Sequence, residues 1–244
     1  MIRIVRGPLP DAVLAGLAKY TAEISEAVEQ KKQAQALWKN TTARRNVHSE
    51  LNKALRRMAA GREYCMYCGD NRGTTIDHFE PVALNPLRTF DWLNHLLACS
   101  GCNSHEKRDQ FPLDDEGRPL LIDPTAEDPF DHLLLTFSIG EYDALTVKGE
   151  ATIEVCDLNN ELLARGRADA TYHLQHLLRD WEKADFLADE TGKSTLVRRV
   201  QDQPLADVCQ SMLRQAHNPN ADLLFQPGIA EILRRSDLQE ALLR

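Results

Sequence analysis

Four cysteines stand in two closely spaced pairs. The pairs are CMYC at 65–68 and CSGC at 99–102, so the four residues are Cys65, Cys68, Cys99 and Cys102. Each pair places two sulfurs across one tight turn, which is how a tetrahedral zinc ion receives two ligands at a time. Four thiolates would close a structural Zn²⁺ site. Two redox pairs of thioredoxin type are the alternative, but that chemistry usually needs a single pair beside a strand–helix unit.

An acid and an imidazole follow a strand-forming run between the two pairs. The run TTI, at 74–76, leads directly into Asp77 and His78, and Pro81 follows three residues later. Successive strand residues point to opposite faces of a sheet. Asp77 and His78 can therefore serve one pocket only if the strand ends or bends there, and Pro81 fits a strand that stops.

Further polar residues lie between the two cysteine pairs and directly after the second pair. The order is C-x2-C, Asp-His, Asn94, C-x2-C-Asn103 and then Lys107. The segments CMYC, IDHFEP and WLNHLLACSGCNSHEK together resemble the motif of HNH endonucleases. That family has a ββα-metal fold held by a four-cysteine zinc. In it the Asp-His pair closes the first strand, the middle Asn lies on the second, and the third motif position opens the helix.

The resemblance implies hydrolysis of phosphodiester bonds in DNA. His78 would be the general base, because a neutral imidazole can take the proton of the attacking water. Asn94, or a backbone carbonyl, would hold the other ring nitrogen of His78. Asp77 and Asn103 would bind one catalytic Mg²⁺ or Mn²⁺ through oxygen. Lys107 lies one helical turn after Asn103, so both would face the same phosphate.

The chain departs from the family pattern at two positions, Asn103 and His95. Many HNH enzymes have His at the third motif position, where this chain has Asn103. His105 lies two residues later, and positions two apart do not share a helix face. His95 stands where an apolar residue would be usual. Its role stays open, with a surface position favoured over a place in the site.

The flanking segments predict helices before the cysteine-rich part. A helix is expected over 10–37, and a second over 41–60 with Thr41 or Thr42 as its cap. Three basic residues lie opposite the apolar face of the second helix. That face is either an ordinary solvated surface or a phosphate-contacting one, and its residues are Arg45, Lys53 and Arg56.

The remainder predicts a connector, two short strands and a helical end. Pro- and Asp-rich residues 111–130 predict a connector. Strands are expected over 132–139 and 151–158, and helices over 159–187, 193–216 and 221–243. The predicted fold is α+β, a mainly helical chain with an embedded zinc-stapled ββα-metal module. Its parts are basic N-terminal helices over 1–63, the module over 64–110, and a connector, short strands and an acidic helical region over 111–244.

Charge is distributed unevenly along the chain. The net charge is −8, yet residues 1–63 carry 12 Lys and Arg against 6 Asp and Glu, while residues 111–244 carry 13 against 25. Such asymmetry suggests different partners at the two ends, with DNA at the basic one. Neither an apolar run after a basic start nor a run of about 18 apolar residues stands in the sequence, so we expect no signal peptide and no membrane span. A cytoplasmic protein without a membrane span is therefore expected.

A narrower resemblance covers about the first 170 residues. The segments MIRIVRGPLP, LIDPTAEDP, TFSIGEY and ATIEVCDLNNELLARGR are arranged as in the HNH nuclease subunits of Septu-type bacterial anti-phage systems. Members often have Glu where this chain has Asp77, and either carboxylate can bind a metal. The resemblance implies a partner ATPase of the ABC/SMC-related type, for which the acidic region 111–244 would offer a docking surface.

Other functions remain open from the sequence. The chain would be a stand-alone nickase or restriction-type nuclease if the basic helix supplied all of the DNA affinity. It would be a non-catalytic, zinc-stabilised nucleic-acid-binding adaptor if the module only bound its target. A single HNH site cuts one strand, so double-strand cleavage would require a homodimer or a larger complex.

Overall fold

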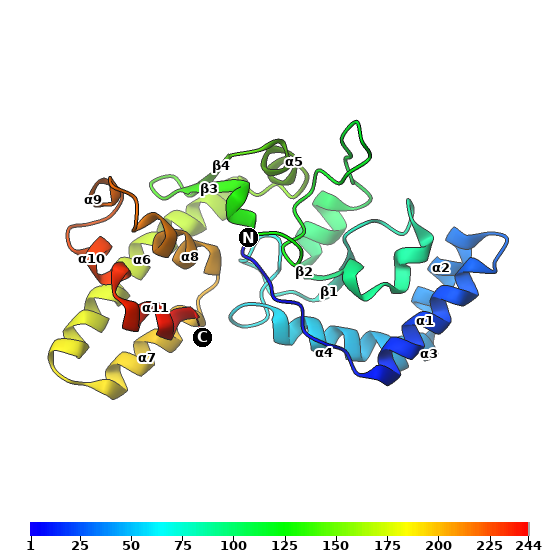
Figure 1. Ribbon diagram of the computed structural model, residues 1–244, viewed down its shortest axis with the longest axis horizontal. Coiled ribbons are helices and arrows are strands. Elements are labelled where there is room, and N and C mark those ends of the chain that lie inside the picture. The colour runs from blue at the N-terminus through cyan, green and yellow to red at the C-terminus, as the bar shows by residue number, and fades with distance from the viewer. Residues whose placement is uncertain (244) are drawn as a thin grey trace.

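The computed structural model describes residues 1–243, which form a mainly helical chain with two small antiparallel sheets. Figure 1 shows helices α1 to α3 at one end of the molecule and helices α6 to α11 at the other. The hairpin of β1 and β2 lies between these two helical parts, and α4 runs beside it (Figure 1). The predicted α+β class and the embedded ββα unit are confirmed.

The predicted helix over 10–37 is two helices. Helix α1 spans Asp11–Ser25 and α2 spans Gln30–Lys39. Val28 lies in the turn between the helices and is fully exposed. The turn folds α2 back against α1. The regular spacing of apolar residues continues through this turn, which is why the sequence pattern predicted one helix.

The second predicted helix is continuous but not uniform. It consists of α3 (Thr41–Ala43), the π-helical segment η1 (Arg44–His48) and α4 (Ser49–Met58). Asn40 is the cap in place of Thr41 or Thr42, because its Oδ1 accepts hydrogen bonds from the backbone N–H groups of Thr42 and Ala43. The buried face agrees with the sequence pattern and comprises Val47, Leu51, Ala54 and Leu55.

The hairpin and the helical segment after it carry the motif residues. Strand β1 (Thr75–His78) pairs antiparallel with β2 (His95–Ala98), so that His78 lies opposite His95 and Asp77 opposite Leu96. The short 3₁₀ segments η2 (Pro86–Phe90) and η3 (Trp92–Asn94) fill the connection between the strands. The π-helical segment η4 (Gly101–Lys107) follows the last cysteine pair and completes the ββα order.

The second sheet differs in part from its prediction. Strand β3 (Leu133–Thr136) lies in the predicted run 132–139, and its partner β4 is Glu141–Ala144. The predicted strand over 151–158 is wrong, because residues Val147–Val155 form helix α5. Two features explain this: β4 immediately after the turn already completes the sheet, and Thr146 caps the helix by accepting from the Gly149 N–H. The 3₁₀ turn η5 (Pro129–Asp131) precedes β3.

The C-terminal part is helical as predicted, although with more breaks. Helix α6 spans Glu161–Phe186, α7 Glu190–Gln201 and α8 Ala206–Gln215. The predicted helix over 193–216 is interrupted before α8, where Leu205 has a φ of 61°. The last three helices are α9 (Ala221–Leu224), α10 (Ile229–Arg234) and α11 (Ser236–Leu243).

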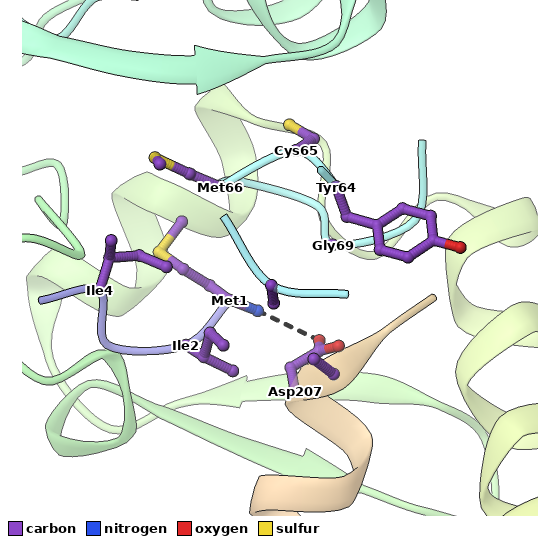
Figure 2. A pocket seen from close by; sticks show the side chains of 10 residues that line it. Met1, Ile2, Ile4, Tyr64, Cys65, Met66, Gly69 and Asp207 are labelled. Carbon is purple, nitrogen blue, oxygen red and sulfur yellow. Dashed lines mark hydrogen bonds and ion pairs between the residues drawn. The ribbon is translucent and has the colours of Figure 1, made fainter. Parts of the chain in front are cut away.

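The first residues link the C-terminal helices to the hairpin. The amino group of Met1 is buried 3.1 Å from Asp207 Oδ2, and the Arg167 guanidinium lies 3.3 Å from the same oxygen. Figure 2 shows the ion pair of Met1 and Asp207 in a pocket that Cys65 also lines. Further along, Arg6 donates hydrogen bonds to the carbonyl oxygens of Trp92 and His95. None of the helices within residues 1–243 combines the length and the apolar character needed to cross a membrane.

Candidate functional site

The four predicted zinc ligands lie together. The sulfur atoms of Cys65, Cys68, Cys99 and Cys102 are all within 4.8 Å of one another, and all four residues are buried. A tetrahedron of sulfurs about 2.3 Å from Zn²⁺ requires sulfur–sulfur distances of about 3.8 Å. The Sγ atoms of Cys68 and Cys99 are 4.0 Å apart. The four residues therefore fit a closed structural zinc site.

Backbone hydrogen bonds hold these sulfurs in place. The first pair sits on a turn closed by the Gly69 N–H, which donates to the Cys65 carbonyl at 2.9 Å. The Met66 N–H donates to the Leu97 carbonyl at 2.9 Å and so ties this turn to β2. Burial raises the pKa of the Cys65 thiol. Because four buried thiolates would repel one another, this cluster is suited to a cation that all four share.

His78 has a defined tautomer. Its Nε2 lies 3.0 Å from the backbone carbonyl oxygen of Thr89, which can only accept a hydrogen bond. Nε2 must therefore carry the proton. Burial lowers the pKa of His78 to about 4, so the ring is neutral at pH 7 and Nδ1 keeps its lone pair. The sequence left two partners open for this ring nitrogen, Asn94 or a backbone carbonyl. In the structure the partner is the backbone carbonyl of Thr89.

The Asn94 side chain forms hydrogen bonds with the backbone of the loop that follows His78. It is fully buried at the end of η3, directly before β2, and so does not lie on the second strand as expected. Its Oδ1 accepts from the Glu80 N–H at 2.7 Å, and its Nδ2 donates to the carbonyls of Glu80 and Arg88 at 3.0 and 3.1 Å. These three bonds join the chain leaving β1 to segment η2. They fix the residue that precedes Thr89.

Asp77 faces away from His78 and is enclosed. Only 3% of it is exposed, and its Oδ2 accepts from the Tyr67 hydroxyl at 2.6 Å. The Lys107 ammonium lies 3.2 Å from the same oxygen and donates to the His78 carbonyl at 2.9 Å. Burial raises the pKa of Asp77, and the charge of Lys107 opposes that shift. Because Lys107 is fully buried, it does not reach a phosphate as expected.

Asn103 also faces β1. Its Nδ2 donates to Thr75 Oγ1 at 3.0 Å and to the Ile76 carbonyl at 3.4 Å. The two residues expected to bind Mg²⁺ or Mn²⁺ thus lie against the same strand. They do not fit such an ion as they are arranged, because the Asp77 carboxylate is buried and Lys107 already neutralises it.

Three residues near His78 were not anticipated. The Trp38 ring centroid lies 4.4 Å from that of His78, 3.7 Å from His48 and 5.4 Å from His95. The expectation of a surface position for His95 was wrong, since it is fully buried. Its alternation within β2 would have placed it on the face of His78 had the strand register been known. His105 is exposed and bonded to the Ser100 carbonyl, outside this group.

The basic face of the second helix is only partly free. Lys53 is paired with Glu50 at 2.7 Å, and Arg56 forms an ion pair with Glu63. Arg45 is exposed and has no ion-pair partner among residues 1–243. Of the three predicted phosphate contacts, Arg45 is therefore the one with an unengaged charge.

Comparisons with known proteins agree with the arrangement of these residues. Residues 65–109 match the family model described as HNH endonuclease. The chain is also 27% identical over 181 residues to the Septu protein PtuB of Bacillus mycoides (strain KBAB4). That match covers 62% of this chain and 59% of the relative, so this chain spans less than two thirds of the relative's length.

Proposed function

We propose that this protein is an HNH endonuclease that hydrolyses phosphodiester bonds in DNA. The observation that carries the proposal is His78, a neutral imidazole whose Nε2–H is held by a backbone carbonyl. It ends the first strand of a zinc-type ββα unit that matches the HNH endonuclease model over residues 65–109. A base with a fixed tautomer and a rigid support is what the activation of water requires.

The chemistry at His78 follows from its tautomer. Nδ1 accepts a proton from a water molecule, and the resulting hydroxide attacks the phosphorus atom. The bond from phosphorus to the leaving oxygen then breaks, and that oxygen takes up a proton from solvent. The pKa of about 4 keeps Nδ1 unprotonated over the neutral range, although it also makes His78 a weaker base than a solvated imidazole.

We include the dependence on Mg²⁺ or Mn²⁺ in the proposal. It requires a rearrangement, because Asp77 would have to separate from Lys107 before its carboxylate could face a metal. Asn103 needs a smaller change, since its bonds to β1 run through Nδ2 and not through its amide oxygen. The requirement for divalent metal is therefore tested separately from the role of His78.

The proposed setting is a bacterial anti-phage complex in the cytoplasm. The similarity to a Septu protein supports it, and so does the separation of basic and acidic segments along the chain. Arg45, with Lys53 and Arg56 after their ion pairs open, would contact DNA. The acidic residues 111–244 would dock an ABC/SMC-like ATPase. A homodimer or larger complex would supply a second site for double-strand cleavage.

A non-catalytic adaptor is the second candidate function. It is favoured by one observation, the buried pair of Asp77 and Lys107, which stabilises the hairpin and leaves no free carboxylate for a metal. Such an adaptor would retain zinc and bind DNA without cutting it. A stand-alone nickase would share the site described above and would differ only in needing no partner.

Plasmid cleavage distinguishes these functions. Supercoiled plasmid is incubated with the full chain, with and without its proposed ATPase partner, in EDTA, Mg²⁺ or Mn²⁺. We expect nicked or linear product in a divalent metal, and none from His78→Ala even though zinc stays bound. His105→Ala is the matched control, because His105 is exposed and lies outside the site. Zinc retention without cleavage under every one of these conditions would favour the adaptor.

A further inference from the structure

Two imidazoles share the carbonyl oxygen of Thr89. His78 Nε2 lies 3.0 Å from this oxygen and His95 Nε2 lies 2.9 Å from it. A carbonyl oxygen has two lone pairs and no proton, so both rings must donate to it through Nε2–H. The two histidines lie opposite each other in the register of β1 and β2, which places them on one face of the hairpin.

Burying an apolar ring at the position of His95 would cost less free energy than burying an imidazole. It is fully buried, stacked on Trp38 and 5.1 Å from the His78 ring centroid. Its Nδ1 is buried and has no hydrogen-bond partner among the described residues. A buried acceptor without a partner destabilises a fold. What a phenyl ring could not supply at this position is the Nε2–H bond to Thr89.

Asn94 and His95 hold two successive carbonyls of segment η2. Asn94 Nδ2 binds the carbonyl of Arg88, and His95 Nε2 binds that of Thr89. We propose that His95 is a positioning residue that keeps the Thr89 carbonyl aimed at Nε2–H of His78 and so leaves Nδ1 of His78 as the base. The inference rests on the proposed role of His78, although the geometry of the shared carbonyl can be tested without it.

Other groups near His78 come from different elements of the chain. Trp38, from α2, packs against the His78 ring, and His48, from η1, packs against Trp38. Lys107, from η4, binds the His78 carbonyl and not its ring. A change in the tautomer of His78 after substitution of His95 would therefore report on the shared Thr89 carbonyl.

The test compares variants by NMR of ¹⁵N-histidine-labelled full chain. His95→Phe keeps a ring beside Trp38 but has no donor, and His95→Leu is a second, smaller variant without a donor. His95→Gln restores an N–H that can reach a carbonyl. We expect a pure Nε2–H signature for His78 in the wild type and in His95→Gln, and mixed tautomers in the two variants without a donor. His173→Leu, on the exposed face of α6, is the matched control.

Cleavage kinetics add a second readout. We expect kcat of His95→Phe to fall by roughly 10- to 100-fold with KM unchanged. This loss is smaller than the full contribution of a general base, because His78 itself is still present. An unchanged His78 signature in zinc-loaded His95→Phe and His95→Leu would overturn the inference. If the signature changes but the wild type never cleaves DNA, the positioning role of His95 stands and the proposed nuclease function fails.

Discussion

The pair of Asp77 and Lys107 gives a sharp prediction about stability. Lys107 is fully buried and Asp77 is 3% exposed, with 3.2 Å between Nζ and Oδ2. Lys107→Met would leave a buried carboxylate without its opposite charge. Removal of one member of a buried ion pair typically costs about 3–5 kcal/mol. We expect a loss of this size in the free energy of unfolding, and a similar loss for Asp77→Asn.

The double variant Asp77→Asn/Lys107→Met should be more stable than the two single losses predict. It buries no charge, so the interaction free energy in the cycle should be at least about 2 kcal/mol. The single variant Lys107→Met should also depend on pH. Burial raises the pKa of Asp77 above its unfolded value, and without Lys107 nothing of opposite charge opposes that shift. The protonated carboxyl is then favoured in the fold, so the loss should be smaller at pH 5 than at pH 8.

The assay is urea unfolding followed by tryptophan fluorescence, at fixed excess zinc and at both pH values. Lys32→Met is the matched control, because its pair with Glu29 is exposed (81% and 70%). An exposed pair of this kind contributes about 0–1 kcal/mol. Strictly additive losses in the cycle, or a loss for Lys107→Met no larger than for Lys32→Met, would refute the reasoning.

Two further predictions concern the zinc site and acid stability. Cys99→Ser should abolish stoichiometric zinc binding, measured by atomic absorption, while Cys209→Ser, outside the cluster, should keep it; equal zinc in both variants would contradict the assignment. Burial lowers the pKa of both His48 and His78 to about 4, from 6.5 when unfolded. The stability that neutral rings contribute is complete above about pH 6.5 and is lost as pH falls from 6.5 to 4. The loss is roughly 3 kcal/mol for the enclosed His78, and smaller for His48, which solvent screens in part. His48→Phe should therefore flatten the dependence of urea unfolding on pH in that range, and an unchanged slope would contradict this.

The cysteine cluster was predictable because its signal is local. The C-x2-C spacing confines each pair of sulfurs to one turn, and only four-way convergence satisfies zinc. The ββα order was implied by the resemblance of these segments to the HNH endonuclease motif. Long helix α6 was also predicted well because its apolar period extends over many turns.

The environment of His78 was less predictable because it depends on contacts between distant segments. Trp38 comes from α2, which could not be placed while residues 10–37 were taken as one helix. The burial of Lys107 depends on which face of η4 packs on β1, a choice that the π-helical geometry shifts by a fraction of a turn. His95 required the register of the hairpin. In each case the residue type was visible in the sequence, but its neighbours were not.

In the proposed reaction, Nδ1 of His78 takes the proton from the attacking water. The most direct measurement is plasmid cleavage by zinc-loaded His78→Gly with increasing imidazole, in which the free base can enter the space of the missing ring. We predict no cleavage without imidazole, and a rate that rises with the concentration of its neutral form. Cleavage by His78→Gly at the wild-type rate without imidazole would contradict the account.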